Sequence, residues 1–79
     1  MMELQTAEQM QNLIGVRGYV MTFWQGRAVM LNWASGGSTG FSFRGLDRMR
    51  NPVDIHIDLA HATEPIFVIT SKTRVNWPW

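Results

Sequence analysis

The residue types that could do chemistry stand in two places, a glycine-rich segment with a serine and a later segment with acids and histidines. Residues 36–40 read Gly-Gly-Ser-Thr-Gly, which fits the G-x-S-x-G pattern of a hydrolase nucleophile, and Asp54 and His56 follow in the order acid, then histidine. That nucleophile stands between a strand and a helix of a large parallel sheet. Because a strand is expected directly after residue 40, the pattern indicates a flexible loop.

The later segment also offers ligands for a metal ion. Asp54, His56 and Asp58 alternate along an expected strand, and His61 follows in a turn. Such donors suit several metals, but alternate strand positions are about 6.5–7 Å apart at Cα, which a metal bridges only with particular rotamers. Alternating acidic residues are typical of the solvent face of an antiparallel strand. We therefore expect a solvated strand face, no metal and no cofactor.

Two short segments resemble the RNA-binding motifs of cold-shock domains. Residues 39–44 read Thr-Gly-Phe-Ser-Phe-Arg and resemble the G-F-x-F core of the first motif, and residues 53–56 read Val-Asp-Ile-His and are similar to the V-F-V-H second motif. Asp54 stands where that family has a stacking aromatic residue. The resemblance implies a small β-barrel that binds single-stranded nucleic acid, with bases stacked on aromatic side chains.

The residues that would bind nucleic acid under this resemblance are Phe41, Phe43 and His56, with Trp33 as a further stacking residue and the arginines on phosphate. The alternative for Phe41 and Phe43 is a place in the hydrophobic core, where phenylalanine is commonly found.

Arginine and tryptophan indicate a different partner. Arg44, Arg48 and Arg50 surround Asp47 and form the one basic concentration, while Trp77 and Trp79 flank Pro78 at the end of the sequence. Both residue types are enriched at the energetic centres of protein interfaces. The alternatives are a solvated loop for the arginines and a tail folded over the core for the tryptophans.

The elements that position these residues begin with a helix and a hairpin. Thr6 and Gln9 form a capping-box pattern and Gly15 supplies a stop, so a helix is expected over 7–14. Gln25-Gly26 joins two segments, 17–24 and 27–33, that are rich in β-branched and aromatic residues and predict a tight hairpin. Its register places Trp24 opposite Arg27, Thr22 opposite Val29 and Val20 opposite Leu31, with Trp33 farther along the same face.

The other face of the hairpin is also apolar and carries Tyr19, Met21, Phe23 and Met30. A short helix covers one face of a sheet, so the second face must be buried by barrel closure, self-association or another protein. Downstream we expect a loop over 35–40, a strand over 41–44, an arginine-bearing loop over 45–52, an alternating strand over 53–59, a turn over 60–65, a central strand over 66–70, and an edge over 76–79.

Length and composition restrict the class of protein. The chain has 79 residues, 46% apolar and 16% charged, with a net charge of +1 and no cysteine. It is long enough for one domain, residues 1–79, with no disulfides or thiol chemistry. The first residues do not resemble a signal peptide and no apolar run spans a bilayer, so we expect a cytoplasmic protein without a membrane partner.

Together these patterns predict an α+β domain with a short N-terminal helix on a curved, mainly antiparallel sheet of about five strands, open or closed as a small barrel. We expect a non-enzymatic protein-binding module, an inhibitor or adaptor such as a phage or mobile element encodes, with a larger protein, a protein complex or a second copy as partner. The binding residues expected are Tyr19, Met21, Phe23, Met30, Arg44, Arg48, Arg50, Trp77 and Trp79; nucleic acid is the alternative partner.

Overall fold

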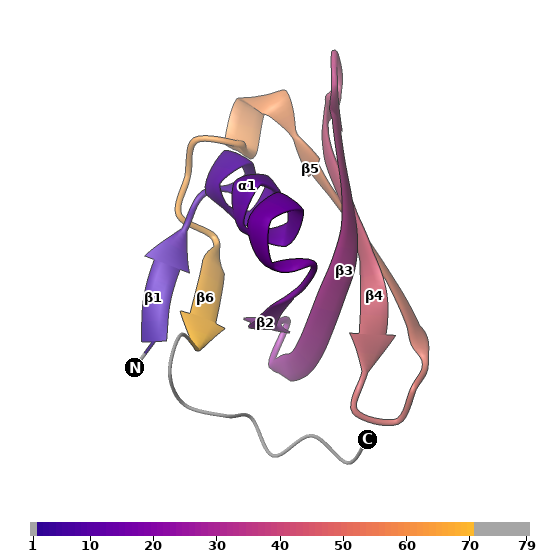
Figure 1. Ribbon diagram of the computed structural model, residues 1–79. Coiled ribbons are helices and arrows are strands. Elements are labelled where there is room, and N and C mark those ends of the chain that lie inside the picture. Colours follow the sequence, from indigo (N-terminus) through magenta and orange to yellow (C-terminus); the bar gives the residue numbers. More distant parts are fainter. Residues whose placement is uncertain (1, 71–79) are drawn as a thin grey trace.

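The protein is described here by a computed structural model that places residues 2–70, with side chains from residue 3 to residue 68 (Figure 1). The elements in chain order are β1 (Met2–Gln5), α1 (Ala7–Arg17), β2 (Val20–Trp24), β3 (Arg27–Gly37), β4 (Gly40–Asp47), β5 (Pro52–Asp58), the 3-10 helix η1 (Leu59–His61) and β6 (Phe67–Thr70).

All six strands form one antiparallel sheet in the order β1-β6-β2-β3-β4-β5, and α1 lies against its concave side (Figure 1). The predicted α+β class is confirmed. Over residues 2–70 the sheet has β1 and β5 as its two ends and is not closed into a barrel, and it has one strand more than expected. The longest described helix is α1 with 11 residues, and no helix in this part of the chain could cross a membrane.

Helix α1 begins as predicted and ends later. The Thr6 side chain accepts from the Gln9 backbone N–H and the Gln9 side chain accepts from the Thr6 N–H, which completes the capping box. Gly15 lies inside the helix, and Gly18 ends it with φ 88° while its N–H donates to the Ile14 carbonyl at 2.8 Å. The predicted stop at Gly15 is wrong because the left-handed conformation that glycine favours is needed three residues later.

The β2–β3 hairpin has the predicted register throughout. Gln25 and Gly26 both have positive φ, 52° and 79°, which is the geometry of a type I′ turn. Helix α1 packs on the face that carries Val20, Thr22 and its neighbours. The buried side chains of this inner face in the hairpin are Val20, Thr22, Val29 and Leu31.

Trp33 does not lie on that inner face, so the prediction for this residue is wrong. The β3–β4 register shifts between Leu31 and Trp33, because Leu31 pairs with Gly45 while Trp33 already pairs with Arg44. The extra residue, Asn32, forms a bulge, and a one-residue shift sends every later side chain of a strand to the opposite face. Trp33 is therefore exposed.

The segments expected as loops on either side of residues 41–44 are largely strand. β3 continues to Gly37 and β4 begins at Gly40, which leaves Ser38 and Thr39 as the turn. β4 then extends to Asp47. Glycine permits this extension because a Cβ at Gly45 would overlap the Met30 carbonyl group of β3, and glycine is used where two backbones approach closely.

The last two strands follow the sequence pattern. Val53, Ile55 and Ile57 of β5 are buried as the alternation predicts, but Leu59 begins η1 and is exposed. β6 lies between β1 and β2, in agreement with its predicted central position. Trp77 and Trp79 lie outside the described residues. The described elements share one sheet and one core, as expected for a single domain.

Candidate protein-binding surface

The side of the sheet opposite α1 carries apolar side chains that adjoin one another across paired strands. Met21 pairs with Met30 across β2 and β3, and Met30 pairs with Leu46 of β4. Phe23 is flanked in the same way by Ala28 and by Val68 of β6, and Val68 pairs with Leu4 of β1. Paired residues of antiparallel strands point to the same face. This surface, called the outer face below, comprises Leu4, Met21, Phe23, Ala28, Met30, Leu46 and Val68. Tyr19 directly precedes β2.

The outer face is only partly shielded from water. Leu4 is 59% exposed, whereas Met21, Phe23 and Met30 are half-buried by their cross-strand neighbours. Tyr19, ahead of β2, is 50% exposed. The sequence placed Tyr19, Met21, Phe23 and Met30 together. It did not identify Leu4, Leu46 or Val68, because the strands that carry them join the surface only through the pairing of the whole sheet.

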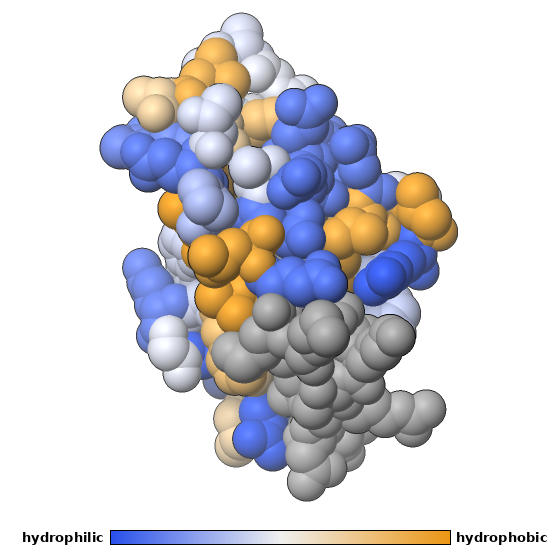
Figure 2. All heavy atoms as spheres, turned by 90° about the vertical axis from the view of Figure 1, so that its left-hand side faces the viewer, coloured by the Kyte–Doolittle hydropathy of each residue, from blue (hydrophilic) through white to orange (hydrophobic). Residues whose placement is uncertain are grey.

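Figure 2 views the side of the molecule where β1 and β6 lie. Hydrophobic residues reach this surface in groups separated by hydrophilic residues. Leu4 of β1 is among the exposed large hydrophobic residues of the protein. The apolar surface therefore extends to the edge strand.

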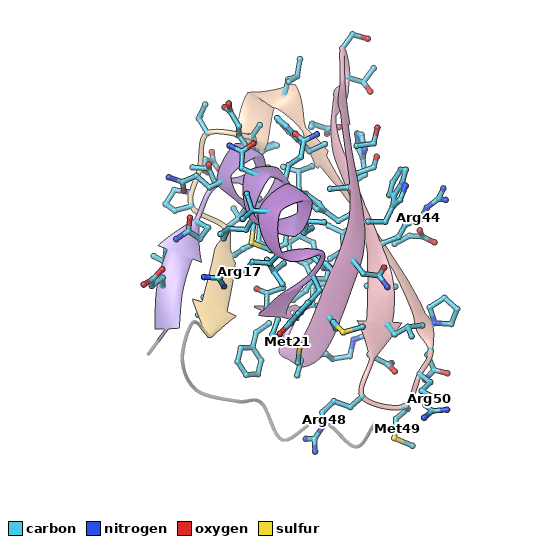
Figure 3. All side chains as sticks on the ribbon, in the orientation of Figure 1. Arg17, Met21, Arg44, Arg48, Met49 and Arg50 are labelled. Carbon is cyan, nitrogen blue, oxygen red and sulfur yellow. The ribbon has the colours of Figure 1, made fainter. Side chains whose placement is uncertain are left out.

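Arg44 belongs to a polar cluster on the strands and not to the arginine loop. Its guanidinium lies 4.7 Å from the centre of the Trp33 ring, and its Nε is 3.1 Å from the Asp54 carboxylate. The three residues are adjacent on β3, β4 and β5. The expected single loop around Asp47 is thus wrong for Arg44, because β4 continues past it. Figure 3 shows Arg44 away from Arg48 and Arg50.

The connection between β4 and β5 displays Arg48, Met49 and Arg50, called the tip below (Figure 3). Met49 is 79% exposed. The Arg50 N–H donates to the Asp47 carbonyl at 3.1 Å, which closes a tight turn, and Arg50 has φ 64°, a left-handed conformation that glycine adopts more easily. The tip therefore holds a defined shape.

The Asp47 carboxylate accepts the hydrogen bonds that hold the tip in its shape. One carboxylate oxygen accepts from the backbone N–H groups of Asn51 and Met49 at 2.9 and 2.8 Å. The other accepts from the Asn51 amide at 3.3 Å and lies 3.6 Å from Arg27. The hydrogen bond from the Asn51 backbone is the largest cause that holds the Asp47 pKa below its ordinary value, while desolvation opposes the shift. The carboxylate is therefore ionised and engaged at neutral pH.

A hollow of about 340 Å³ lies between the β2–β3 turn and the tip. Phe23, Ala28 and Met49 provide apolar lining, and Arg27 and Arg48 provide charged lining. Phe23 also belongs to the outer face, so the hollow adjoins that face. Sequence reasoning missed the hollow because its two sides are brought together by the pairing of Val29 with Asp47.

The residues proposed for nucleic acid do not share a face. Phe43 is fully buried and contacts Phe67 edge to face at 5.4 Å between ring centres, and Phe41 packs against the same core. His56 is exposed on the opposite side of β5. The stacking platform implied by the cold-shock resemblance is therefore not formed, and the core alternative for Phe43 is confirmed.

His56 instead belongs to a polar row across β4 and β5. Ser42 Oγ lies 3.0 Å from His56 Nδ1, and His56 Nε2 lies 3.3 Å from Asp58 Oδ1. Ser42, His56 and Asp58 thus follow one another in contact, and they lie on an open strand surface. Ser38 of the G-x-S-x-G pattern lies in the β3–β4 turn, between two strands, so the geometry of a hydrolase nucleophile is not present at that serine.

A second hollow, of about 260 Å³, is lined by Trp24, His56, Asp58, His61 and Glu64. His61 lies 3.5 Å from Glu64, so each histidine is beside its own carboxylate. Within the residues that the structure describes, no group of three or more histidine, aspartate or glutamate side chains is arranged to hold a metal ion. The four side chains that the sequence offered as ligands, Asp54, His56, Asp58 and His61, are thus divided between separate contacts.

Comparison with protein-family models, with curated proteins and with solved structures finds nothing that matches this chain.

Proposed function

We propose that the protein is a non-enzymatic binding module that docks on a larger protein through its outer face and its tip, as an inhibitor or adaptor. The observation that carries the proposal is the outer face itself. Helix α1 covers the inner face, whereas the described elements provide no layer over the opposite one (Figure 1). Contiguous apolar surface of this kind commonly marks an interaction site.

The open sheet strengthens this proposal. Barrel closure was one of three ways in which the second apolar face could be buried, and the described strands run from β1 to β5 without closing into a barrel. Another protein or a second copy would then cover the face. Methionine and aromatic residues suit that role because they present large apolar surface and, for methionine, adapt to the shape of a partner.

The test uses the variant Met21→Arg and the matched control Val16→Arg. Val16 is an apolar residue of α1 that is 85% exposed and lies outside the outer face. Each tagged protein is incubated with nuclease-treated lysate and washed at about 0.5 M salt, which suppresses phosphate-driven contacts. We expect a stoichiometric protein to be retained by the wild type and by Val16→Arg, and to be lost with Met21→Arg.

Thermal unfolding followed by circular dichroism accompanies the assay. A folded Met21→Arg protein that keeps the same retained protein would contradict docking through the outer face. If Met21→Arg does not fold, Met30→Glu on the neighbouring strand replaces it. Light scattering identifies a second copy as the partner if the wild type is dimeric and the outer-face variant is monomeric.

A further inference from the structure

We infer that the hollow beneath the tip receives one apolar side chain from an acidic segment of the partner protein. The inference rests on the proposed function and deepens it by naming what the partner presents. It concerns the hollow lined by Phe23, Ala28, Met49, Arg27 and Arg48, which adjoins the outer face at Phe23.

The hollow has the size and lining to hold an apolar side chain. Its volume is about 340 Å³, and cavities of about 150 Å³ already accommodate a benzene-sized group. The Phe23 ring and the Ala28 methyl come from the β2–β3 hairpin, and Met49 closes the opposite side from the tip. A leucine or phenylalanine side chain placed there would also cover part of Met49, which is otherwise 79% exposed.

The positive charge around the hollow favours an apolar side chain with acidic residues beside it in the partner's sequence. Arg48 makes no ion pair with any of the residues that the structure describes, and the Arg27 side chain is 58% exposed with one carboxylate contact at 3.6 Å. Asp47 is the acidic residue of the lining, and its oxygens are already engaged by Asn51, Met49 and Arg27. Guanidinium groups with free donors bind carboxylates through paired hydrogen bonds.

A polypeptide fits these features better than a nucleic acid does. The lining combines three apolar residues with two arginines, whereas binding of a nucleic-acid strand requires a row of basic residues and open aromatic faces. Phe43, which would have supplied such a face, is buried. The site therefore matches an apolar anchor between acidic residues.

The test is a titration of the isotope-labelled protein, followed by NMR, with short capped peptides and an oligonucleotide. The probe is the peptide Asp-Glu-Leu-Glu-Asp. The control peptides are Asp-Glu-Ser-Glu-Asp, which lacks the apolar side chain, and Lys-Lys-Leu-Lys-Lys, which has the opposite charge. An oligothymidine of eight nucleotides is the nucleic-acid control. We expect the probe to shift the amides of Gly26, Ala28 and Met49 with a Kd of about 1 mM. Removal of the leucine side chain should weaken binding about tenfold.

Variants test the charge assignment. Arg48→Glu should lose the acidic probe and gain the lysine peptide, whereas Arg17→Glu, an equal change on α1, should bind the acidic probe like the wild type. Absence of saturable shifts at the three amides, equal binding of all peptides, or stronger binding of the oligonucleotide would each overturn the inference.

These outcomes are separate from those of the lysate assay. Met21 belongs to the outer face but does not line the hollow, so the Met21→Arg protein should still bind the acidic probe, with shifts at the same three amides. If the probe binds but Met21→Arg still retains the partner protein, the outer-face proposal is wrong and the inference about the hollow stands. If the probe does not bind but Met21→Arg loses the partner protein, the inference about the hollow is wrong and the outer-face proposal stands.

Discussion

Asp47 shows how one side chain sets the shape of a functional element. Its carboxylate accepts three hydrogen bonds from residues of the same connection and lies beside Arg27. The sequence identified Asp47 as a charge among arginines. Its role as an acceptor for backbone N–H groups depends on the turn that brings Met49 and Asn51 over it. The sequence analysis did not predict that turn.

At the residue scale we predict a pH-dependent contribution from Asp47. Since its folded-state pKa is lowered, with the Asn51 backbone hydrogen bond as the largest cause, its stabilisation is present above the ordinary carboxyl pKa. That stabilisation is lost as the pH falls below about 4 toward the lowered pKa. Asp47→Asn should therefore lower the urea midpoint at neutral pH, and the difference from the wild type should shrink at about pH 3.

Urea unfolding of the two proteins at both pH values measures this effect. Other carboxylates titrate equally in both proteins and cancel from the difference. A difference in urea midpoint that stays constant with pH would show that the Asp47 charge has no part in holding the tip.

The β3–β4 hairpin is the element that departs most from the expected structure. Its glycines indicated a loop, because glycine in sequence is usually a breaker. In the structure Gly45 instead permits the β4 backbone to lie against Met30. The register of the neighbouring hairpin was predicted correctly, because Gln25-Gly26 specifies a two-residue turn and a turn of known length fixes the register. The outer bounds of its strands were not, since β2 begins at Val20 and β3 continues to Gly37.

At the element scale we predict that Gly45→Ala destabilises the protein by about 3 kcal/mol, because the added methyl group overlaps backbone that cannot move independently. Gly37→Ala is the matched control in the same hairpin, since nothing lies within 4 Å of the position of its Cβ. Chemical unfolding of both variants gives the comparison. Equal stability of the two variants would disprove the close approach at Gly45.

The bulge at Asn32 explains why the candidate site was only partly predictable. Alternation assigns Met21, Phe23 and Met30 correctly to one face, since no irregularity lies between them and the turn. Beyond Leu31 the same alternation places Trp33 on the wrong face. Nothing in the local sequence marks that shift, which arises where β3 bends along β4.

At the scale of the whole molecule, stability depends on the inner face. Phe43 and Phe67 are fully buried, and Trp24 stacks on Phe67 at 5.3 Å between ring centres. We predict that Phe43→Ala lowers the free energy of unfolding by about 3–5 kcal/mol, out of a total of about 4–12 kcal/mol for a chain of this length.

Trp33→Ala on the exposed side is the control for this prediction and should cost about 1 kcal/mol or less. Both values come from denaturant unfolding. If Phe43→Ala kept the stability of the wild type and lost affinity for single-stranded nucleic acid, Phe43 would be a binding residue and the described core would be wrong.

The pairing of β1 with β6 joins an early strand to a late one, since Gln5 pairs with Phe67. At a synthesis rate of about 5–20 residues per second, roughly 3–12 s separate the translation of these two partners. Throughout that time β1 has no strand to pair with, while the β2–β3 hairpin can already form. The sheet is thus completed in an order different from that of the chain, and the edge strand β1 is the first to be made and among the last to be paired.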